Sequence, residues 1–156
     1  RDKVSSCYGY GVTLSALQIA QAYSVFANDG NFIELKLFTE HSFDKPMKER
    51  VISEETNQII LKMLVETVNS KSGTASKARI NNMIVAGKTG TAKETLAEET
   101  TYTGTFAGFV PSKDPEFLAV VVLHGLSGED YSGGKVSAPV FSNIMQQIFL
   151  SKDLKI

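Results

Sequence analysis

The sequence is organised around the stretch Val85-Ala86-Gly87-Lys88-Thr89-Gly90-Thr91-Ala92. Glycine weakens a strand interior and usually marks a place where a ligand or another backbone comes close. Alternation puts the lysine and the second glycine on one face of an ideal strand and the two threonines on the other. A sharp twist or bulge near the glycines would bring the ammonium and both hydroxyls to one rim. Such a rim suits a carboxylate, and an exposed sheet edge would add free backbone N–H groups.

Three interpretations of this stretch compete. The first is a buried strand whose lysine reaches out to solvent. The second is a phosphate-binding loop, because Gly-Lys-Thr ends the motif Gly-x-x-x-x-Gly-Lys-[Ser/Thr]. That motif needs a glycine where Asn82 stands, and it must open a helix where Gly90 follows at once, so it does not fit. The third is the Lys-Thr-Gly element that accompanies Ser-x-x-Lys and Ser-Asp-Asn in penicillin-binding proteins and class A β-lactamases. A bare triplet is a weak signal, so the rest of the chain must decide.

Composition sets limits on the class of protein. The 156 residues are 42% hydrophobic, which is enough for one domain with a core. A net charge of −1 gives no electrostatic case for binding nucleic acid or an anionic membrane. No apolar run approaches the roughly 18 residues that a membrane span needs. The single cysteine, Cys7, excludes an intrachain disulfide, and the distant His41 and His124 predict no metal site.

Helical periodicity marks the first half of the chain. Thr13 is a plausible N-cap for a first helix, which ends at the residues 28–30. Residues 33–38 are expected to form a short strand or an extended segment, followed by a loop over 41–50. Ser53 is expected to cap a second helix. The segment 69–78, rich in Ser, Gly, Thr and Lys, is expected to be a flexible loop.

The second half indicates a sheet. After a polar, acidic loop over 93–100, the segment 101–110 alternates with period two, and 117–123 is a continuous apolar strand. A glycine-rich loop over 125–134 leads to a last helix that starts near Pro139. Three strands joined by short loops, with helices before and after, predict an α+β fold in which helices cover an antiparallel sheet.

The order of these parts resembles the transpeptidase domain of class B penicillin-binding proteins, and the resemblance covers about residues 9–150. The similar segments are Gly9-Tyr10-Gly11, Leu17 to Tyr23, Ala27 to Gly30, Ser72 to Ala75, Val85 to Ala92, Phe106 to Pro111 and Gly133 to Phe141. The resemblance implies the penicillin-binding protein and serine β-lactamase fold. It favours the cell-division member of class B, with the elongation member close behind. A serine β-lactamase fits less well, because two class-B-like helices precede the core strand.

The nucleophile expected from this resemblance is absent from the sequence. In the family it lies in Ser-x-x-Lys at the start of a buried helix, where the lysine can activate the hydroxyl. That spacing occurs at Ser42–Lys45, which runs into Pro46, and at Ser132–Lys135, which is a glycine loop. Neither can open such a helix, and Ser-x-Asn is missing. Residues 1–156 are therefore expected to be the C-terminal part of a transpeptidase domain, with the nucleophile half and a membrane anchor upstream.

The resemblance also implies roles for individual residues. Lys88 would supply positive potential to the substrate's terminal carboxylate, which Thr89 and Thr91 would hydrogen-bond. The backbone N–H of Thr91, with that of the nucleophile, would form the oxyanion hole. Gly90 would let the acyl donor lie alongside as an added strand. Gly87 fits a packing role as well as a direct one.

Other polar residues are expected to have smaller roles. Tyr102 could face the substrate or belong to a solvated β face, and Thr103 and Thr105 are expected on a solvated face. His124 is expected to end a strand, and Cys7 has no expected role. The residues expected at the surface of the glycine-rich loop are Glu129, Asp130 and Tyr131.

The function implied by the resemblance is peptidoglycan cross-linking by serine acyl transfer, without a cofactor. The implied partners are D-alanyl-D-alanine stem peptides, β-lactam antibiotics that mimic them, the upstream half of the domain, and the division or elongation machinery. The implied location is the periplasmic side of the bacterial inner membrane. A β-lactam sensor or a non-catalytic binding module of the same fold stays open as the alternative.

Overall fold

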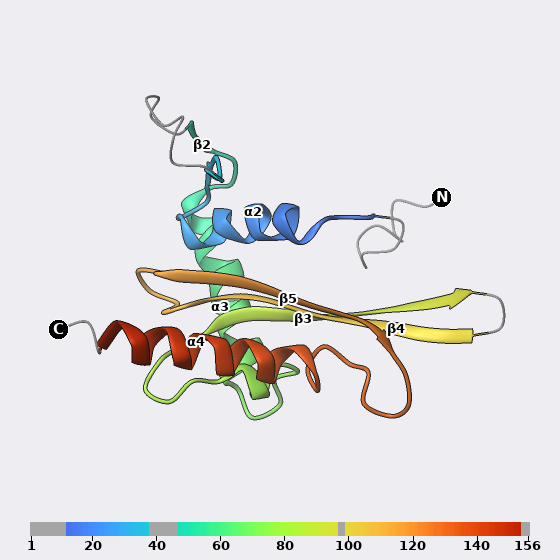
Figure 1. Ribbon diagram of the computed structural model, residues 1–156. Coiled ribbons are helices and arrows are strands. Elements are labelled where there is room, and N and C mark those ends of the chain that lie inside the picture. Colours follow the sequence, from blue (N-terminus) through green and yellow to red (C-terminus); the bar gives the residue numbers. More distant parts are fainter. Residues whose placement is uncertain (1–11, 38–46, 97–98, 154–156) are drawn as a thin grey trace.

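The computed structural model describes residues 12–37, 47–96 and 99–153 (Figure 1). Its centre is a three-stranded antiparallel sheet in the order β3-β4-β5, and β1 and β2 form a separate pair. The elements in chain order are α2 (Ala16–Ala27), β1 (Asn31–Ile33), β2 (Lys48–Arg50), α3 (Glu54–Asn69), the 3-10 helix η1 (Ser76–Ala78), β3 (Ala86–Leu96), β4 (Glu99–Val110), β5 (Phe117–Leu126) and α4 (Ser137–Asp153). The predicted α+β class is confirmed.

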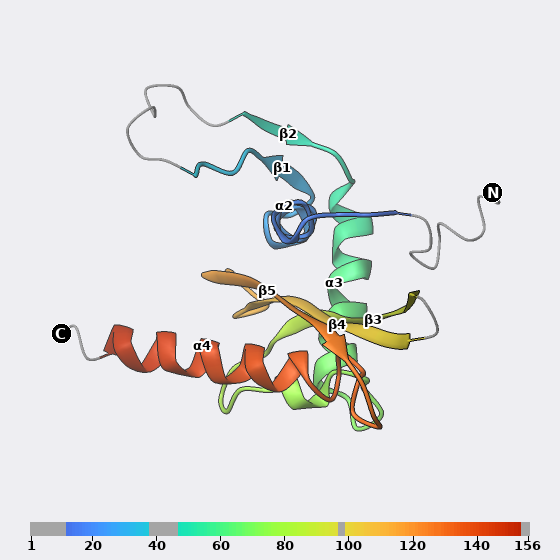
Figure 2. The same ribbon diagram turned by 45° about the vertical axis from the view of Figure 1, so that its right-hand side comes forward.

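Two cores hold the helices against opposite faces of the sheet (Figures 1 and 2). On the α4 face, Phe106 and Phe141 are fully buried, with ring centroids 4.8 Å apart in an edge-on arrangement. On the other face, Phe109 packs in a cluster with Leu64 of α3 and with residues of α2. Burial of each such aromatic side chain contributes about 1.5–3 kcal/mol. Helix α3 runs past the β3 edge of the sheet (Figure 2). Val68, near the C-terminal end of α3, therefore packs in the core on the α4 face.

The helix boundaries follow the local capping chemistry. Helix α2 is capped by Ser15 instead of Thr13, because Ser15 forms a capping box with Gln18 three residues on. Ser53 caps α3 as predicted, and its hydroxyl accepts from the N–H of Thr56 at 3.1 Å. Helix α4 begins at Ser137, two residues before Pro139. Proline is tolerated there because N–H groups in the first turn have no partner within the helix.

The segment between α2 and α3 differs from the prediction. The strand Asn31–Ile33 begins earlier than the strand or extended segment expected at 33–38, and it pairs with Lys48–Arg50 inside the expected loop. Residues 38–46 lie outside the described part of the chain. Gly30, with φ +82°, makes the turn before β1, and a Cβ there would lie 2.5 Å from the carbonyl oxygen of Ile52.

Strands β3 and β4 form a longer hairpin than predicted. Residues 93–96 and 99–100, expected in a loop, continue the pairing from Ala86↔Phe109 to Leu96↔Glu99 without interruption. Threonine favours extended backbone, and the hydroxyls of Thr95 and Thr100 approach to 3.4 Å across the strands. The bulge expected near the glycines is not in β3. The register shift lies between β4 and β5, at Tyr102 and Gly104.

The segment 69–78 is anchored, contrary to the prediction of a flexible loop. Ala75 and Ala78 are fully buried, and the N–H of Ala75 donates to Thr67 in α3 at 3.1 Å. The Arg79 guanidinium donates to the carbonyl oxygen of Val68 at 2.9 Å and also to that of Ser70. These bonds satisfy carbonyls at the end of α3, which an unsupported helix end would leave without a partner.

Candidate substrate-binding edge of the sheet

Lys88 and Thr89 lie on β3, at an edge of the described three-stranded sheet. The Lys88 ammonium donates to the backbone oxygen of Thr89 at 3.0 Å and lies 3.4 Å from its hydroxyl. The lysine side chain thus turns over the free edge and reaches a residue on the opposite face. This is how the charge and the hydroxyl meet at one rim although β3 has no bulge. Lys88 is exposed and forms no ion pair with any residue in the described ranges.

Alternation along β3 determines which backbone groups face the free edge. In an antiparallel pair, the N–H and C=O of one residue point to the same side, and successive residues alternate. The carbonyl of Thr89 accepts from the Lys88 side chain, and that of Val85 accepts from the side-chain amide of Asn69 at 2.8 Å. Both carbonyls therefore point away from β4. Thr91 has the same parity, so its N–H also faces the free edge.

The hydroxyls of Thr89 and Thr91 lie on the same face of β3, and each meets a different loop. The Thr89 hydroxyl is 3.4 Å from that of Thr74, in the anchored segment before β3. The Thr91 hydroxyl accepts from the N–H of Gly133, in the loop after β5, at 3.2 Å. A Cβ on Gly133 would lie 2.2 Å from the carbonyl oxygen of Thr105, so only glycine allows this approach.

A shallow hollow of about 560 Å³ lies beside Lys88 on the α3 side of β3. It is lined by Lys62, Met63, Glu66, Thr67, Ser70, Ser72, Gly73, Thr74 and Lys88. Lys88 and Thr89 lie on a strand as predicted, and Lys88 lines this hollow, whereas Thr89 does not. Thr74 lines the same hollow, and its hydroxyl contacts that of Thr89. Thr74 therefore connects the hollow beside Lys88 with the face of β3 that carries the threonine hydroxyls.

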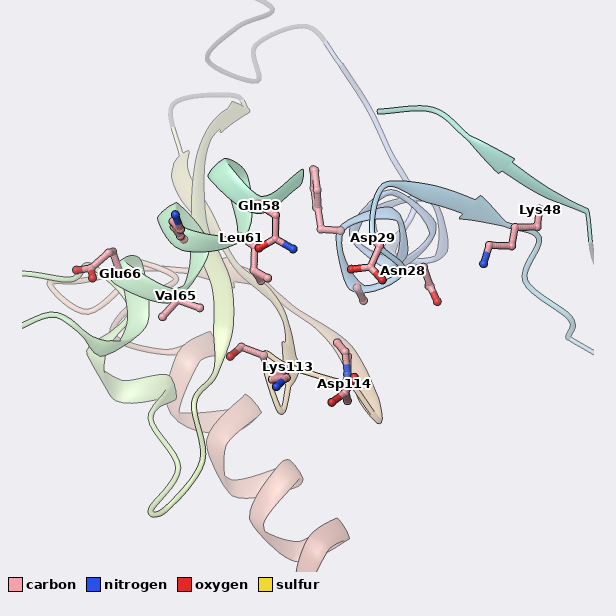
Figure 3. Close-up of a pocket in the computed structure, with 14 residues that line it drawn as sticks. Asn28, Asp29, Lys48, Gln58, Leu61, Val65, Glu66, Lys113 and Asp114 are labelled. Carbon is pink, nitrogen blue, oxygen red and sulfur yellow. The ribbon is translucent and has the colours of Figure 1, made fainter. Parts of the chain in front are cut away.

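A larger hollow of about 780 Å³, which shares Lys62 and Glu66 with the first, lies between α2, α3 and the turn that joins β4 to β5 (Figure 3). Lys113 and Asp114 on that turn lie across from Asn28 and Asp29 at the end of α2 (Figure 3). None of the predicted site residues lines it. Size alone would therefore select a different place from the one that the sequence motif selects.

Three residues, Thr103, Thr105 and Tyr131, are less exposed than predicted. Thr103 is buried, with 8% of its surface exposed, and its hydroxyl lies 2.9 Å from Nδ1 of His124. It is not part of a solvated face, and its hydroxyl contacts the side chains of Glu94 and His124. Thr105 is half-buried. Tyr131, expected at the loop surface, stacks on Tyr102 with ring centroids 3.8 Å apart.

The Ser-x-x-Lys spacing at Ser132 forms a turn, as predicted. The N–H of Lys135 donates to the carbonyl oxygen of Ser132 at 2.8 Å, and helix α4 begins only at Ser137. The Lys135 ammonium pairs with Asp130 at 2.9 Å. That hydrogen bond and the lysine charge hold the pKa of the Asp130 carboxyl below its ordinary value. The second such spacing, Ser42–Lys45, lies outside the described residues.

Sequence reasoning missed two groups of the site, the Thr74 hydroxyl and the Gly133 N–H. Both come from loops distant from β3 in the sequence, and no periodic pattern reports such contacts. In the described ranges, no three His, Cys, Asp or Glu side chains gather to hold a metal ion. No helix among the described residues is long and apolar enough to cross a bilayer.

Comparison with known proteins identifies the family. The family model of the penicillin binding protein transpeptidase domain matches residues 2–146. The chain is 32% identical over 151 residues to the protein named probable peptidoglycan D,D-transpeptidase PenA of Neisseria flavescens, covering 92% of this chain and 36% of that protein. It is 31% identical over 158 residues to peptidoglycan D,D-transpeptidase FtsI of Escherichia coli, covering 99% of this chain and 26% of that protein.

A solved structure supports the same family assignment. The transpeptidase domain of Burkholderia pseudomallei penicillin-binding protein 3 superimposes with a TM-score of 0.80 at 31% identity, covering 97% of this chain and 46% of that chain. The chain thus spans about a quarter to a third of the length of those two curated relatives, and about half of the solved domain. The matching family model, the shared fold and the Lys-Thr-Gly edge strand agree, and the chain belongs to the family of penicillin-binding protein transpeptidase domains.

Proposed function

We propose that residues 1–156 are the C-terminal part of a class B transpeptidase domain, and that the whole protein is a peptidoglycan D,D-transpeptidase of the cell-division type. The names of the relatives support the activity, and the FtsI protein among them supports the division type. The coverage of 97% of this chain but 46% of the solved domain supports the partial-domain assignment. In this proposal the nucleophilic serine and its activating lysine belong to the other part of the domain.

The observation that carries the proposal is the rim formed by Lys88, Thr89 and Thr91. At the outer strand of the described sheet lie two hydroxyls and an ammonium that forms no ion pair with any described residue. A carboxylate is an acceptor with two oxygens, and charge-assisted hydrogen bonds to it are about twice as strong as neutral ones. The terminal carboxylate of a D-alanyl-D-alanine peptide, or the carboxylate of a penicillin, is the proposed occupant of this rim.

The same edge supplies two further groups to the proposed reaction. The N–H of Thr91, on the free-edge side of β3, would donate to the carbonyl oxygen under attack, together with the N–H of the serine. Removing one such donor typically costs about 3–4 kcal/mol in the barrier. Gly90 is exposed and carries no side chain on the Lys88 face, so the acyl donor can lie along β3 as an added strand.

The proposed chemistry is acyl transfer in two steps. The serine Oγ forms a bond to the carbonyl carbon of the penultimate D-alanine, its proton passes to the base, and the bond to the terminal D-alanine breaks as that amine leaves with a proton. An amine of a second stem peptide then attacks the ester, and the serine hydroxyl is regenerated. A β-lactam forms the same ester when its ring opens, so it would occupy the serine. No cofactor takes part in these steps.

The proposed setting follows from the family and not from this chain's own features. The whole protein would be anchored in the bacterial inner membrane by a segment upstream and would act on the periplasmic side, beside the division machinery. Its partners would be stem peptides, β-lactams and the other half of its own domain.

The test uses the complete protein with a peptide that ends in D-alanyl-D-alanine and an amine acceptor. We expect release of one D-alanine for each cross-link formed, and inhibition of both by benzylpenicillin. A β-lactam sensor of the same fold would bind penicillin covalently but release no D-alanine from the peptide. Covalent binding without turnover of any stem peptide would therefore favour the alternative and contradict the transpeptidase proposal.

A further inference from the structure

We propose that Thr74 is a positioning residue that sets the direction of the Thr89 hydroxyl proton, so that Thr89 donates to the bound carboxylate. The inference rests on the proposed function and adds a residue from outside the Lys-Thr-Gly strand. Its starting observation is the contact between the hydroxyls of Thr74 and Thr89, at 3.4 Å.

The hydroxyls of Thr74 and Thr89 and the Lys88 ammonium differ in what they can donate and accept. A threonine hydroxyl has one proton to donate and two lone pairs that accept, whereas an ammonium only donates. The Lys88 ammonium, 3.4 Å from the Thr89 hydroxyl, can therefore occupy only a lone pair of Thr89. An arriving carboxylate accepts only, so it must take the Thr89 proton. Thr74 keeps its bond to Thr89 in that state only by donating its own proton to the remaining lone pair.

Either hydroxyl of this pair can donate, and the state in which Thr74 donates is the one that leaves Thr89 as a donor to the carboxylate. With both lone pairs taken by Lys88 and Thr74, the proton of Thr89 points to the position left open. Donors that are aligned in advance do not need to reorient when the ligand binds, which favours binding.

Thr91 shows the same pattern with a different donor. The N–H of Gly133 donates to the Thr91 hydroxyl at 3.2 Å and takes one of its lone pairs. Each threonine of the rim is therefore approached by a group from another loop, Thr74 for one and Gly133 for the other. Both hydroxyls keep their proton for the same ligand.

The backbone of Thr74 is held well enough for this role. The following residue, Ala75, is fully buried, and its N–H is bonded to Thr67 of α3. A Cβ on the preceding Gly73 would lie 2.3 Å from the carbonyl oxygen of Thr67, and one on Gly134 would lie 2.3 Å from the carbonyl oxygen of Thr74. Thr74 is exposed at its side chain, but its chain is fixed from both sides.

The experiment measures the second-order rate of acylation of the complete transpeptidase domain by benzylpenicillin. Thr74→Val removes the hydroxyl and keeps the shape, and we expect a rate roughly three- to tenfold lower, the effect of losing one hydrogen bond. Thr74→Ser keeps the hydroxyl and should act within about twofold of the parent. Thr100→Val is the matched control, because Thr100 also faces another threonine hydroxyl at 3.4 Å but lies far along the hairpin. It should leave the rate unchanged.

A second probe separates positioning from a structural role. Benzylpenicillin methyl ester lacks the negative charge, so the Thr74→Val loss should be clearly smaller with the ester than with the acid. Equal losses with acid and ester, or a Thr74→Ser rate as low as that of Thr74→Val, would overturn the inference. If Thr74→Val does not fold, Thr74→Ala replaces it in the same comparison. Failure of the parent domain to react with penicillin would refute the proposed function. A parent-like acylation rate for Thr74→Val, or for Thr74→Ala in its place, would refute only the role of Thr74.

Discussion

Replacing Lys88 by methionine should separate substrate recognition from stability. The side chain is exposed, and its bonds in the described structure are to the carbonyl oxygen and hydroxyl of Thr89. Methionine keeps an unbranched side chain, one atom shorter, and removes the charge together with its N–H donors. Because surface substitutions of this kind usually change stability by about 0.5 kcal/mol or less, the melting temperature should hardly move.

The effect on acylation should be much larger. A hydrogen bond that involves a charged group contributes about 1.5–3 kcal/mol, which corresponds to a fall of roughly ten- to a hundredfold in the acylation rate. The assay follows labelled penicillin on the complete domain by gel fluorescence. Lys93→Met is the matched control, since Lys93 is exposed on the same strand five residues on. Equal rates for Lys88→Met and the parent, or equal losses for the two variants, would refute the assigned role.

Three further predictions concern packing, pH and the chain alone. Gly87→Ala should lower the free energy of unfolding by about 1–3 kcal/mol, because the new Cβ would lie 2.5 Å from the Phe106 ring. Gly90→Ala should barely change it, because the nearest contact of its Cβ would be 3.6 Å away. Denaturant unfolding measures both changes. Burial raises the pKa of Tyr23, so the folded chain holds this proton to higher pH than the unfolded chain, and stability should fall as pH rises above about 10. Tyr23→Phe should remove that part of the fall in alkaline unfolding curves. Residues 1–156 alone should gain no stoichiometric penicillin adduct in intact-mass spectra, because the Ser132–Lys135 spacing forms a turn and the Thr103 hydroxyl beside His124 is buried; such an adduct would contradict the partial-domain proposal.

The sequence predicted those parts of the fold that a single periodic pattern describes. The alternation in 101–110 and the apolar run in 117–123 correspond to β4 and β5, and the Ser53 cap corresponds to the start of α3. The extension of the hairpin through 93–100 was not predicted, because its polar residues bury no face. The extended conformation of this segment is determined by cross-strand pairing, which depends on the partner strand and not on the segment's own sequence pattern.

The candidate site was predicted only in part, because a sequence motif identifies neighbours on one strand and not contacts between distant segments. Lys88 and Thr89 are neighbours in sequence, so a motif can place them together on one strand. The lysine turns over the edge to meet Thr89, which alternation alone does not predict. Thr74 and Gly133 reach the rim only because the anchored loop before β3 and the loop after β5 fold back on it. Contacts of that kind depend on tertiary structure.

The central claim is that this edge of β3 holds the carboxylate and carbonyl of an acyl donor whose serine lies elsewhere in the domain. The most direct measurement is a crystal structure of the complete domain after reaction with benzylpenicillin. We expect the penicillin carboxylate within hydrogen-bond distance of the hydroxyls of Thr89 and Thr91, and the ester carbonyl oxygen at the N–H of Thr91. A penicilloyl group whose carboxylate lies away from both threonines, or an ester on a residue of this chain, would contradict the claim.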